Sequence, residues 1–159
     1  MDQTFTQVID KNLSISLKSI SVIDVKKSFT IANFYDIDNT IIFPIYGNFR
    51  YGKYKKKIEK DAVLFIPAHN TISLSFGSKR SQTLAYEDFI DNKSKFISED
   101  NLISNRPKVD KYLIINLDVK AYDLVNIFHT KNLDVYNLYN KELSVLFKKI
   151  IHELKTKLV

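Results

Sequence analysis

Three histidines are the first residues in this chain that could do chemistry: His69, His129 and His152. A metal site in a small β-barrel needs two or three His and a carboxylate that converge from neighbouring strands. Only His69 falls in the part of the sequence that is rich in strand signals, and no His-x-His pair occurs. We therefore interpret His69 as a polar turn residue and His152 as a residue at the packing edge of a helix, and we expect no catalytic metal.

Other catalytic signatures are also missing from the sequence. There is no Cys, no G-x-S-x-G motif, and only three Gly from which a phosphate-binding loop could be built. The acidic pairs Glu87-Asp88 and Glu99-Asp100 lie in a polar region, where such residues are usually solvated. We therefore expect a protein that is not an enzyme, with no catalytic residues and no cofactor.

A basic run at residues 50–57, with the sequence RYGKYKKK, offers a different chemistry. Aromatic residues interleaved with positive charges suit single-stranded nucleic acid on a β-surface. The other interpretation is a hairpin tip whose Lys residues keep a sheet edge soluble and unpaired. The net charge is +6, but only three of the basic residues are Arg, the residue best suited to phosphates and guanine. Direct nucleic-acid binding is the alternative function.

The composition favours one globular domain. The chain has 159 residues, of which 45% are hydrophobic and 26% charged, and its aromatic residues are all Phe or Tyr. No stretch approaches 18 consecutive apolar residues, and the first residues show no signal-peptide pattern. We expect a soluble, cytoplasmic protein that does not contact a membrane.

Strand signals fill the first half of the chain. Alternating or β-branched segments occur at residues 13–17, 20–25, 29–35, 40–46, 62–66, 72–76 and 111–117. Residues 46–76 are predicted to form short strands of a small barrel, with one tight turn at 67–70. Pro44 cannot donate a hydrogen bond, so its strand should be an edge or bulged there. Gly47 and Gly52 allow a positive φ.

Helices are predicted towards the C-terminus. A loop or short helix is expected at residues 78–108, and Asp118 is expected to cap a helix over 119–128. The last segment has apolar residues at steps of three and four, which predicts an amphipathic helix. Part of this stripe has the spacing of a helix-pairing seam, so we predict a homodimer through it. The predicted dimer interface consists of Leu143, Leu146, Phe147, Ile150, Leu154 and Leu158.

The central passage resembles the N-terminal sensing domain of AraC-type transcription regulators. The resemblance is carried by Tyr46-Gly47-Asn48-Phe49, then Tyr51-Gly52, and then the run from Lys57 through Asp61 to Pro67-Ala68-His69. It implies an α+β fold, in which residues 1–117 form a cupin-like β-barrel of the double-stranded β-helix type. Residues 118–159 would then form a segment of two helices used for dimerisation. The family's helix-turn-helix units have no counterpart in this chain, so DNA binding is expected only through a domain absent from it.

The resemblance implies a bacterial, non-enzymatic sensor whose barrel accepts a small effector. Such pockets are mostly apolar with a few polar anchors. Alternation along the strands gives the predicted lining residues Phe43, Tyr46, Phe49, Phe65 and Leu74. A shift of one residue would reverse this set, because neighbouring side chains point to opposite faces. A metal-free cupin isomerase is a third possibility, which would require a paired acid and base inside the barrel.

Overall fold

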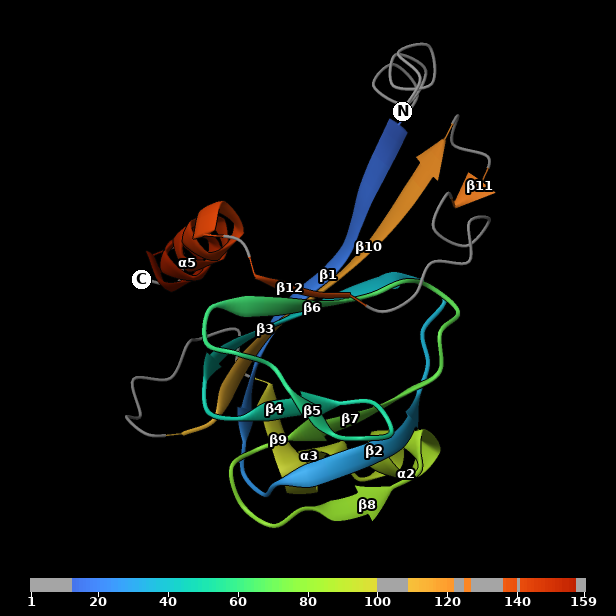
Figure 1. Cartoon of the computed structure of the whole chain (residues 1–159), viewed down its shortest axis with the longest axis vertical. Helices are drawn as coiled ribbons and strands as arrows, with labels where there is room; N and C mark the ends of the chain where they lie inside the picture. Colours follow the sequence, from blue (N-terminus) through green and yellow to red (C-terminus); the bar gives the residue numbers. More distant parts are fainter. Residues whose placement is uncertain (1–12, 100–108, 122–124, 127–135, 140, 157–159) are drawn as a thin grey trace.

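Two facing β-sheets form the body of the protein in a computed structural model (Figure 1). The structure describes residues 13–99, 109–121, 125–126, 136–139 and 141–156. The chain is mainly β with few helices, which agrees with the predicted α+β class. The described strands form two separate hydrogen-bonded sheets rather than one closed barrel.

The larger sheet has the strand order β12-β6-β3-β10-β1-β9, and β11 pairs with β10. All of its pairs are antiparallel. Its strands are β1 (Leu13–Val25), β3 (Asn39–Tyr46), β6 (Ala62–Ile66), β9 (Ile97–Glu99), β10 (Lys111–Ala121), β11 (Val125–Asn126) and β12 (Tyr136–Tyr139).

The smaller sheet has the order β5-β4-β7-β2-β8 and is antiparallel except for the pair β2 and β8. Its strands are β2 (Phe29–Phe34), β4 (Phe49–Tyr51), β5 (Lys56–Lys57), β7 (Ile72–Phe76) and β8 (Gln82–Leu84). The described helices are α2 (Tyr86–Asp91), α3 (Lys93–Phe96) and α5 (Lys141–Thr156). α2 and α3 lead the chain from β8 in the smaller sheet to β9 in the larger one.

Two irregularities in the larger sheet follow from the sequence. The segments predicted at 13–17 and 20–25 form one long strand, β1, whose register against β10 shifts between Leu17 and Ser19. β3 lies in the middle of the sheet, and its register against β10 shifts between Pro44 and Tyr46. The predicted bulge at Pro44 is therefore confirmed. Pro44 also lies beyond the residues of β3 that pair with β6, so its missing N–H costs no ladder bond on that side.

The helix predicted after Asp118 is wrong for residues 119–121. These residues continue β10, where Val119, Lys120 and Ala121 pair with the first residues of β1. A local capping signal was outweighed because β1 is long enough to offer ladder partners along the whole of β10. Residues 122–124 and 127–128 of the predicted helix lie outside the described part of the chain. α5 is the one C-terminal helix among the described residues.

The predicted turns have the expected backbone. Gly47 and Gly52 have φ of 100° and 81°. Gly47 also passes close to the Asp110 side chain, which would overlap with any Cβ at this position. His69 has a φ of 65° in the turn between β6 and β7, and the Tyr35 hydroxyl lies 2.6 Å from its Nδ1. Of the segment 78–108, which is predicted to be a loop or short helix, the structure describes residues 78–99, and these contain β8, α2, α3 and β9.

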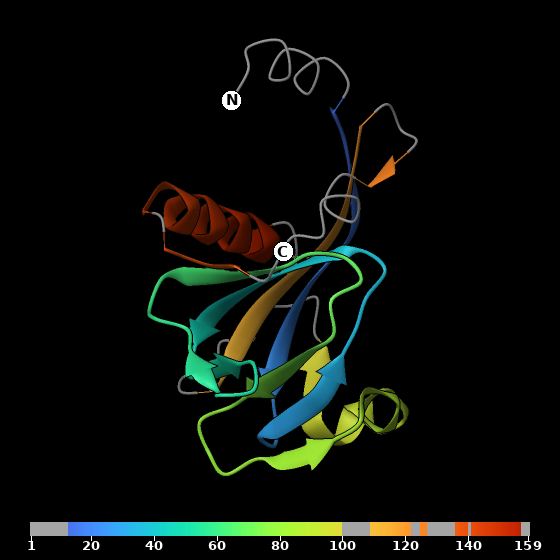
Figure 2. The same cartoon turned by 45° about the vertical axis from the view of Figure 1, so that its right-hand side comes forward.

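The core has two layers. Between the sheets, Phe29 stacks on Phe76 and Phe89 with ring centroids 5.1 and 4.8 Å apart. On the other face of the larger sheet, Phe43 stacks on Phe147 of α5 at 5.4 Å. α5 therefore covers the side of the larger sheet that points away from the smaller sheet, as a second view shows (Figure 2). The middle of the larger sheet is therefore buried on both faces.

Tyr112 connects the two sheets through its hydroxyl. It is fully buried on β10, donates to the carbonyl oxygen of Asn48 and accepts from the N–H of Gly77 at 2.9 Å. Burial raises the pKa of Tyr112 far above its usual value, while the Gly77 hydrogen bond acts in the opposite direction. The phenol therefore stays protonated and able to donate.

Replacing Tyr112 with Phe should lower the free energy of unfolding by about 1–3 kcal/mol, because two partly buried backbone groups lose their partner. Urea denaturation followed by circular dichroism measures this loss. Tyr46→Phe is the control, since Tyr46 is exposed and its change should stay within about 0.5 kcal/mol. Equal stabilities of Tyr112→Phe and the unmodified protein would contradict this role.

Candidate functional site: a cavity between the sheets

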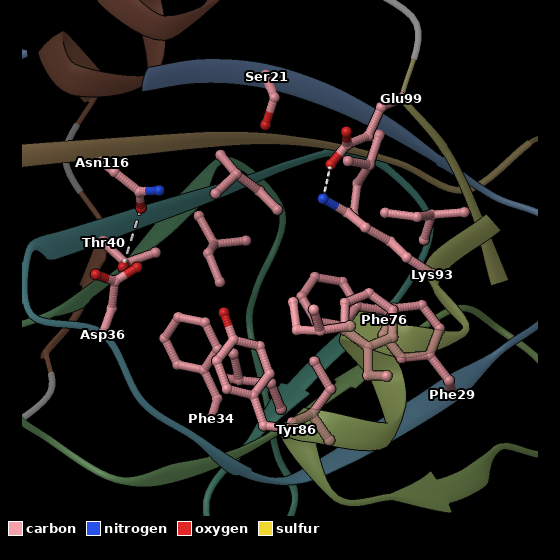
Figure 3. A pocket seen from close by; sticks show the side chains of 18 of the residues that line it. Ser21, Phe29, Phe34, Asp36, Thr40, Phe76, Tyr86, Lys93, Glu99 and Asn116 are labelled. Atoms are coloured by element: carbon pink, nitrogen blue, oxygen red, sulfur yellow. Dashed lines mark hydrogen bonds and ion pairs between the residues drawn. The ribbon is translucent and has the colours of Figure 1, made fainter. Parts of the chain in front are cut away.

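A cavity of about 360 Å³ lies between the two sheets (Figure 3). Its wall is built from alternate residues of several strands, because every second side chain of a strand points to the same face. From the larger sheet come residues such as Ile23, Ile42 and Ile114, and from the smaller sheet Ile31 and Leu74. Most of the wall is therefore apolar. Its remaining lining residues are Ser19, Ser21, Phe29, Phe34, Asp36, Thr40, Phe76, Tyr86, Phe89, Ile90, Lys93, Ile97, Glu99 and Asn116.

A chain of hydrogen bonds forms the polar part of the larger sheet's wall. The Thr40 hydroxyl donates to Oδ1 of Asn116 at 3.1 Å, and Nδ2 of Asn116 donates to the Ser19 hydroxyl at 3.1 Å. These three residues lie on three adjacent strands, β3, β10 and β1, so the sheet itself fixes their spacing. These three side chains present hydroxyl and amide groups that can bind the polar part of a ligand.

Charged groups are few in the cavity wall. Lys93 of α3 forms an ion pair with Glu99 of β9, and both side chains are partly exposed. Asp36 follows β2, and Tyr86 starts α2 beside it. Figure 3 shows the Tyr86 hydroxyl directed towards the interior of the cavity, with Phe34 next to its ring. Burial raises the pKa of Tyr86, and the negative charge of Asp36 raises it further, so Tyr86 enters the cavity as a neutral hydrogen-bonding group.

The residues predicted to line a pocket are divided between the two faces of the sheets. Leu74 lines the cavity, and Phe49 lies in the same core, where its ring packs on Phe76 at 4.8 Å without reaching the lining. Phe43 points to the opposite face of β3 and packs on α5. Tyr46 is exposed at the end of β3, and Phe65 is half-buried on the face opposite Leu64. The structure does not bring these five residues into one site.

The polar lining residues were missed because their sequence signals point elsewhere. Ser19 and Ser21 alternate with Ile20 and Val22, which would normally place the Ser residues towards solvent. In the structure Ile20 and Val22 face α5, and the Ser residues face the cavity. The sequence around Asp36 and Tyr86 carries only loop and helix-start signals, so nothing local indicates that they meet.

The predicted dimer stripe packs partly on the protein itself. Phe147 is buried against the larger sheet, and Ile150 packs at the edge of the same cluster. Leu146 is 50% exposed on α5, and its neighbour Val145 is 47% exposed. The side chains of Leu143 and Leu154, and all of Leu158, lie outside the described part of the chain.

The basic run forms the hairpin that was predicted as one interpretation. Arg50 pairs with Lys57 and Tyr51 with Lys56, and β5 is the edge strand of the smaller sheet. Tyr54 at the tip is 88% exposed, and the Lys53 ammonium lies 5.8 Å from the centre of its ring. This arrangement matches Lys residues that protect a sheet edge. Nucleic-acid binding by the hairpin stays a prediction.

A second hollow, of about 550 Å³, lies where α5 meets the turns that follow β3 and precede β6. Its wall includes five charged side chains, Lys57, Glu59, Lys60, Asp61 and Lys148. Asp61 and Lys148 form an ion pair across it at 3.2 Å. We prefer the cavity between the sheets as the ligand site, because its wall is mostly apolar whereas the wall of this hollow is rich in charged side chains.

Comparisons with known proteins add no family to this picture. Over the described residues, no three His, Asp or Glu side chains are grouped so that they could hold a metal ion. In the same part of the chain, no helix has the length and apolar character needed to cross a membrane. Protein-family models, curated proteins and solved structures gave no match to this chain.

Proposed function

We propose that this chain is a small-molecule sensor domain that binds its effector in the cavity between the two sheets. The single observation that carries this proposal is the cavity itself, a largely apolar space with a few polar groups in its wall. Ligand sites of proteins have this composition, since apolar area supplies affinity and a few polar anchors fix orientation.

The wider context of the proposal is the AraC-type sensing domain. Its support is the sequence resemblance of residues 46–69 and the order of the elements, with strands first and a C-terminal helix last. We also propose a cupin-like fold, because the two sheets face each other across a cavity. Effector binding would then shift the equilibrium between two arrangements of the helices, because the effector binds one arrangement more tightly than the other.

Dimerisation through α5 is part of the proposed function. Val145 and Leu146 leave apolar surface exposed on a helix whose other side is already covered by the sheet. We expect a dimer in light scattering at tens of micromolar, and Leu146→Glu should convert it to a monomer because a charge would be buried in the contact. Lys149→Glu, a charge change at an exposed position of the same helix, is the control. A monomer in the unmodified protein would refute the pairing of helices.

Blocking the cavity tests ligand binding. Ser21 lines the cavity from β1, so the ring of Ser21→Phe should occupy space that a ligand needs. With 2-phenylethanol as a neutral probe, we expect this variant to lose about tenfold or more in affinity, equivalent to about 1.4 kcal/mol. Ser16→Phe is the matched control, because Ser16 is exposed on the same strand and outside the cavity. Equal affinities of both variants would count against the site.

A further inference from the structure

We infer that the cavity selects an apolar molecule with a positively charged head group, such as an amine or ammonium, and binds that head group between Asp36, Phe34 and Tyr86. This inference rests on the proposed function and names the class of its ligand. It depends on three observations: a carboxylate with free capacity, an aromatic pair beside it, and the charge balance of the cavity wall.

Asp36 presents a carboxylate that its own loop holds in place. Its Oδ1 accepts a hydrogen bond from the N–H of Asp38 at 2.9 Å, and its carbonyl oxygen accepts one from the N–H of His69 at 2.9 Å. No donor among the described residues is bonded to the other carboxylate oxygen. A carboxylate has about four acceptor sites, so Asp36 keeps capacity for a donor from a ligand.

An aromatic pair lines the same cavity as this carboxylate. The rings of Phe34 and Tyr86 have centroids 5.2 Å apart and are tilted by 59°, so they pack against each other in the cavity wall. The faces of aromatic rings attract cations, and proteins recognise ammonium groups with such arrangements. The charge of Asp36 contributes to the raised pKa of Tyr86, which places the carboxylate and the phenol in one electrostatic environment.

The charges of the cavity wall disfavour an anionic ligand. The charged lining residues are one Lys and two acids, and Lys93 is already paired with Glu99. Asp36 is therefore the uncompensated charge, and the wall is negative although the whole chain carries +6. An anionic ligand would meet Asp36 without a free cation to offset the repulsion, whereas a cationic ligand would neutralise it.

Three probes of similar shape separate the alternatives: 2-phenylethylamine as the cation, 2-phenylethanol as the neutral probe and 3-phenylpropanoate as the anion. Each is titrated into the full chain at pH 7 and followed by the methyl resonances of isoleucines. We expect the amine to bind about tenfold more tightly than the alcohol, as a cation on aromatic rings beside a carboxylate should. The anion should bind more weakly than the alcohol.

Asp36→Asn keeps the acceptor for the Asp38 N–H and removes the charge. This variant should bind amine and alcohol equally, while its affinity for the alcohol stays unchanged. Asp88→Asn, an identical charge change at an exposed position of α2 outside the lining, should keep the preference for the amine. Tyr86→Leu should lower the preference for the amine with Asp36 intact.

The outcomes distinguish this inference from the proposed function. If the alcohol binds in the cavity and the amine gains nothing over it, the inference is overturned and the cavity site stands. A preference for the amine that survives Asp36→Asn also overturns the inference. If none of the three probes perturbs the cavity, both fail.

Discussion

Phe29→Ala is expected to be among the most destabilising single substitutions in the protein, with a loss of about 3–5 kcal/mol in the free energy of unfolding. Phe29 is fully buried, and its ring contacts Phe76, Phe89 and Phe96 with centroid distances of 5.1, 4.8 and 5.6 Å. These partners come from β7, α2 and α3, so the ring joins one sheet to both short helices. Its removal leaves a space that the surrounding strands cannot close.

Chemical denaturation measures this loss, and Tyr54→Ala is the control. Tyr54 is also aromatic, but it is 88% exposed at a hairpin tip, so its substitution should change stability by no more than about 0.5 kcal/mol. A loss below about 1 kcal/mol for Phe29→Ala would show that the three aromatic contacts do not form as described.

Lys111→Met is expected to cost a similar amount, for a different reason. The Lys111 ammonium lies 3.2 Å from Oδ1 of Asp24, and the two side chains are only 9% and 11% exposed. Removing the Lys leaves the Asp24 carboxylate buried without this partner. Breaking a buried pair in this way costs about 3–5 kcal/mol, because an uncompensated charge stays in a poorly solvated place.

The chain offers a matched control for this pair. Lys148 and Asp61 are also 3.2 Å apart, but their side chains are 59% and 30% exposed. Lys148→Met should therefore cost less than about 1 kcal/mol, since solvent already screens the pair. The double variant Asp24→Leu with Lys111→Met should recover most of the loss of the single variant. Equal losses for Lys111→Met and Lys148→Met would contradict the effect of burial.

Local patterns in the sequence predicted most of the strands, but not how far each one extends. The alternation at 13–17 and 20–25 is visible in the sequence, whereas the continuous strand β1 depends on its pairing with β10. The same pairing keeps residues 119–121 extended, although Asp118 carries a helix-capping signal. Strand ends are decided by a partner that is distant in the sequence, so local propensity is a weak guide to them.

The side of the strands that faces the cavity could not be predicted, for a physical reason. Alternation identifies the buried face of a sheet when the other face is in water. Here the middle of the larger sheet is covered on one face by the smaller sheet and on the other by α5. Phe43 and Ile42 are both buried, on opposite faces of β3, and only Ile42 lines the cavity. Knowledge of where α5 packs is required to choose between them.

The most direct test of the cavity site is a methyl NMR titration with 2-phenylethanol on isoleucine-labelled protein. Six isoleucines line the cavity, Ile23, Ile31, Ile42, Ile90, Ile97 and Ile114. Six others belong to the cluster on the opposite face of the larger sheet, where α5 packs: Ile20, Ile41, Ile45, Ile115, Ile150 and Ile151. We predict saturable shifts of the first set with the second set unmoved. Shifts confined to the second set, or no shifts at all, would contradict a ligand site between the sheets.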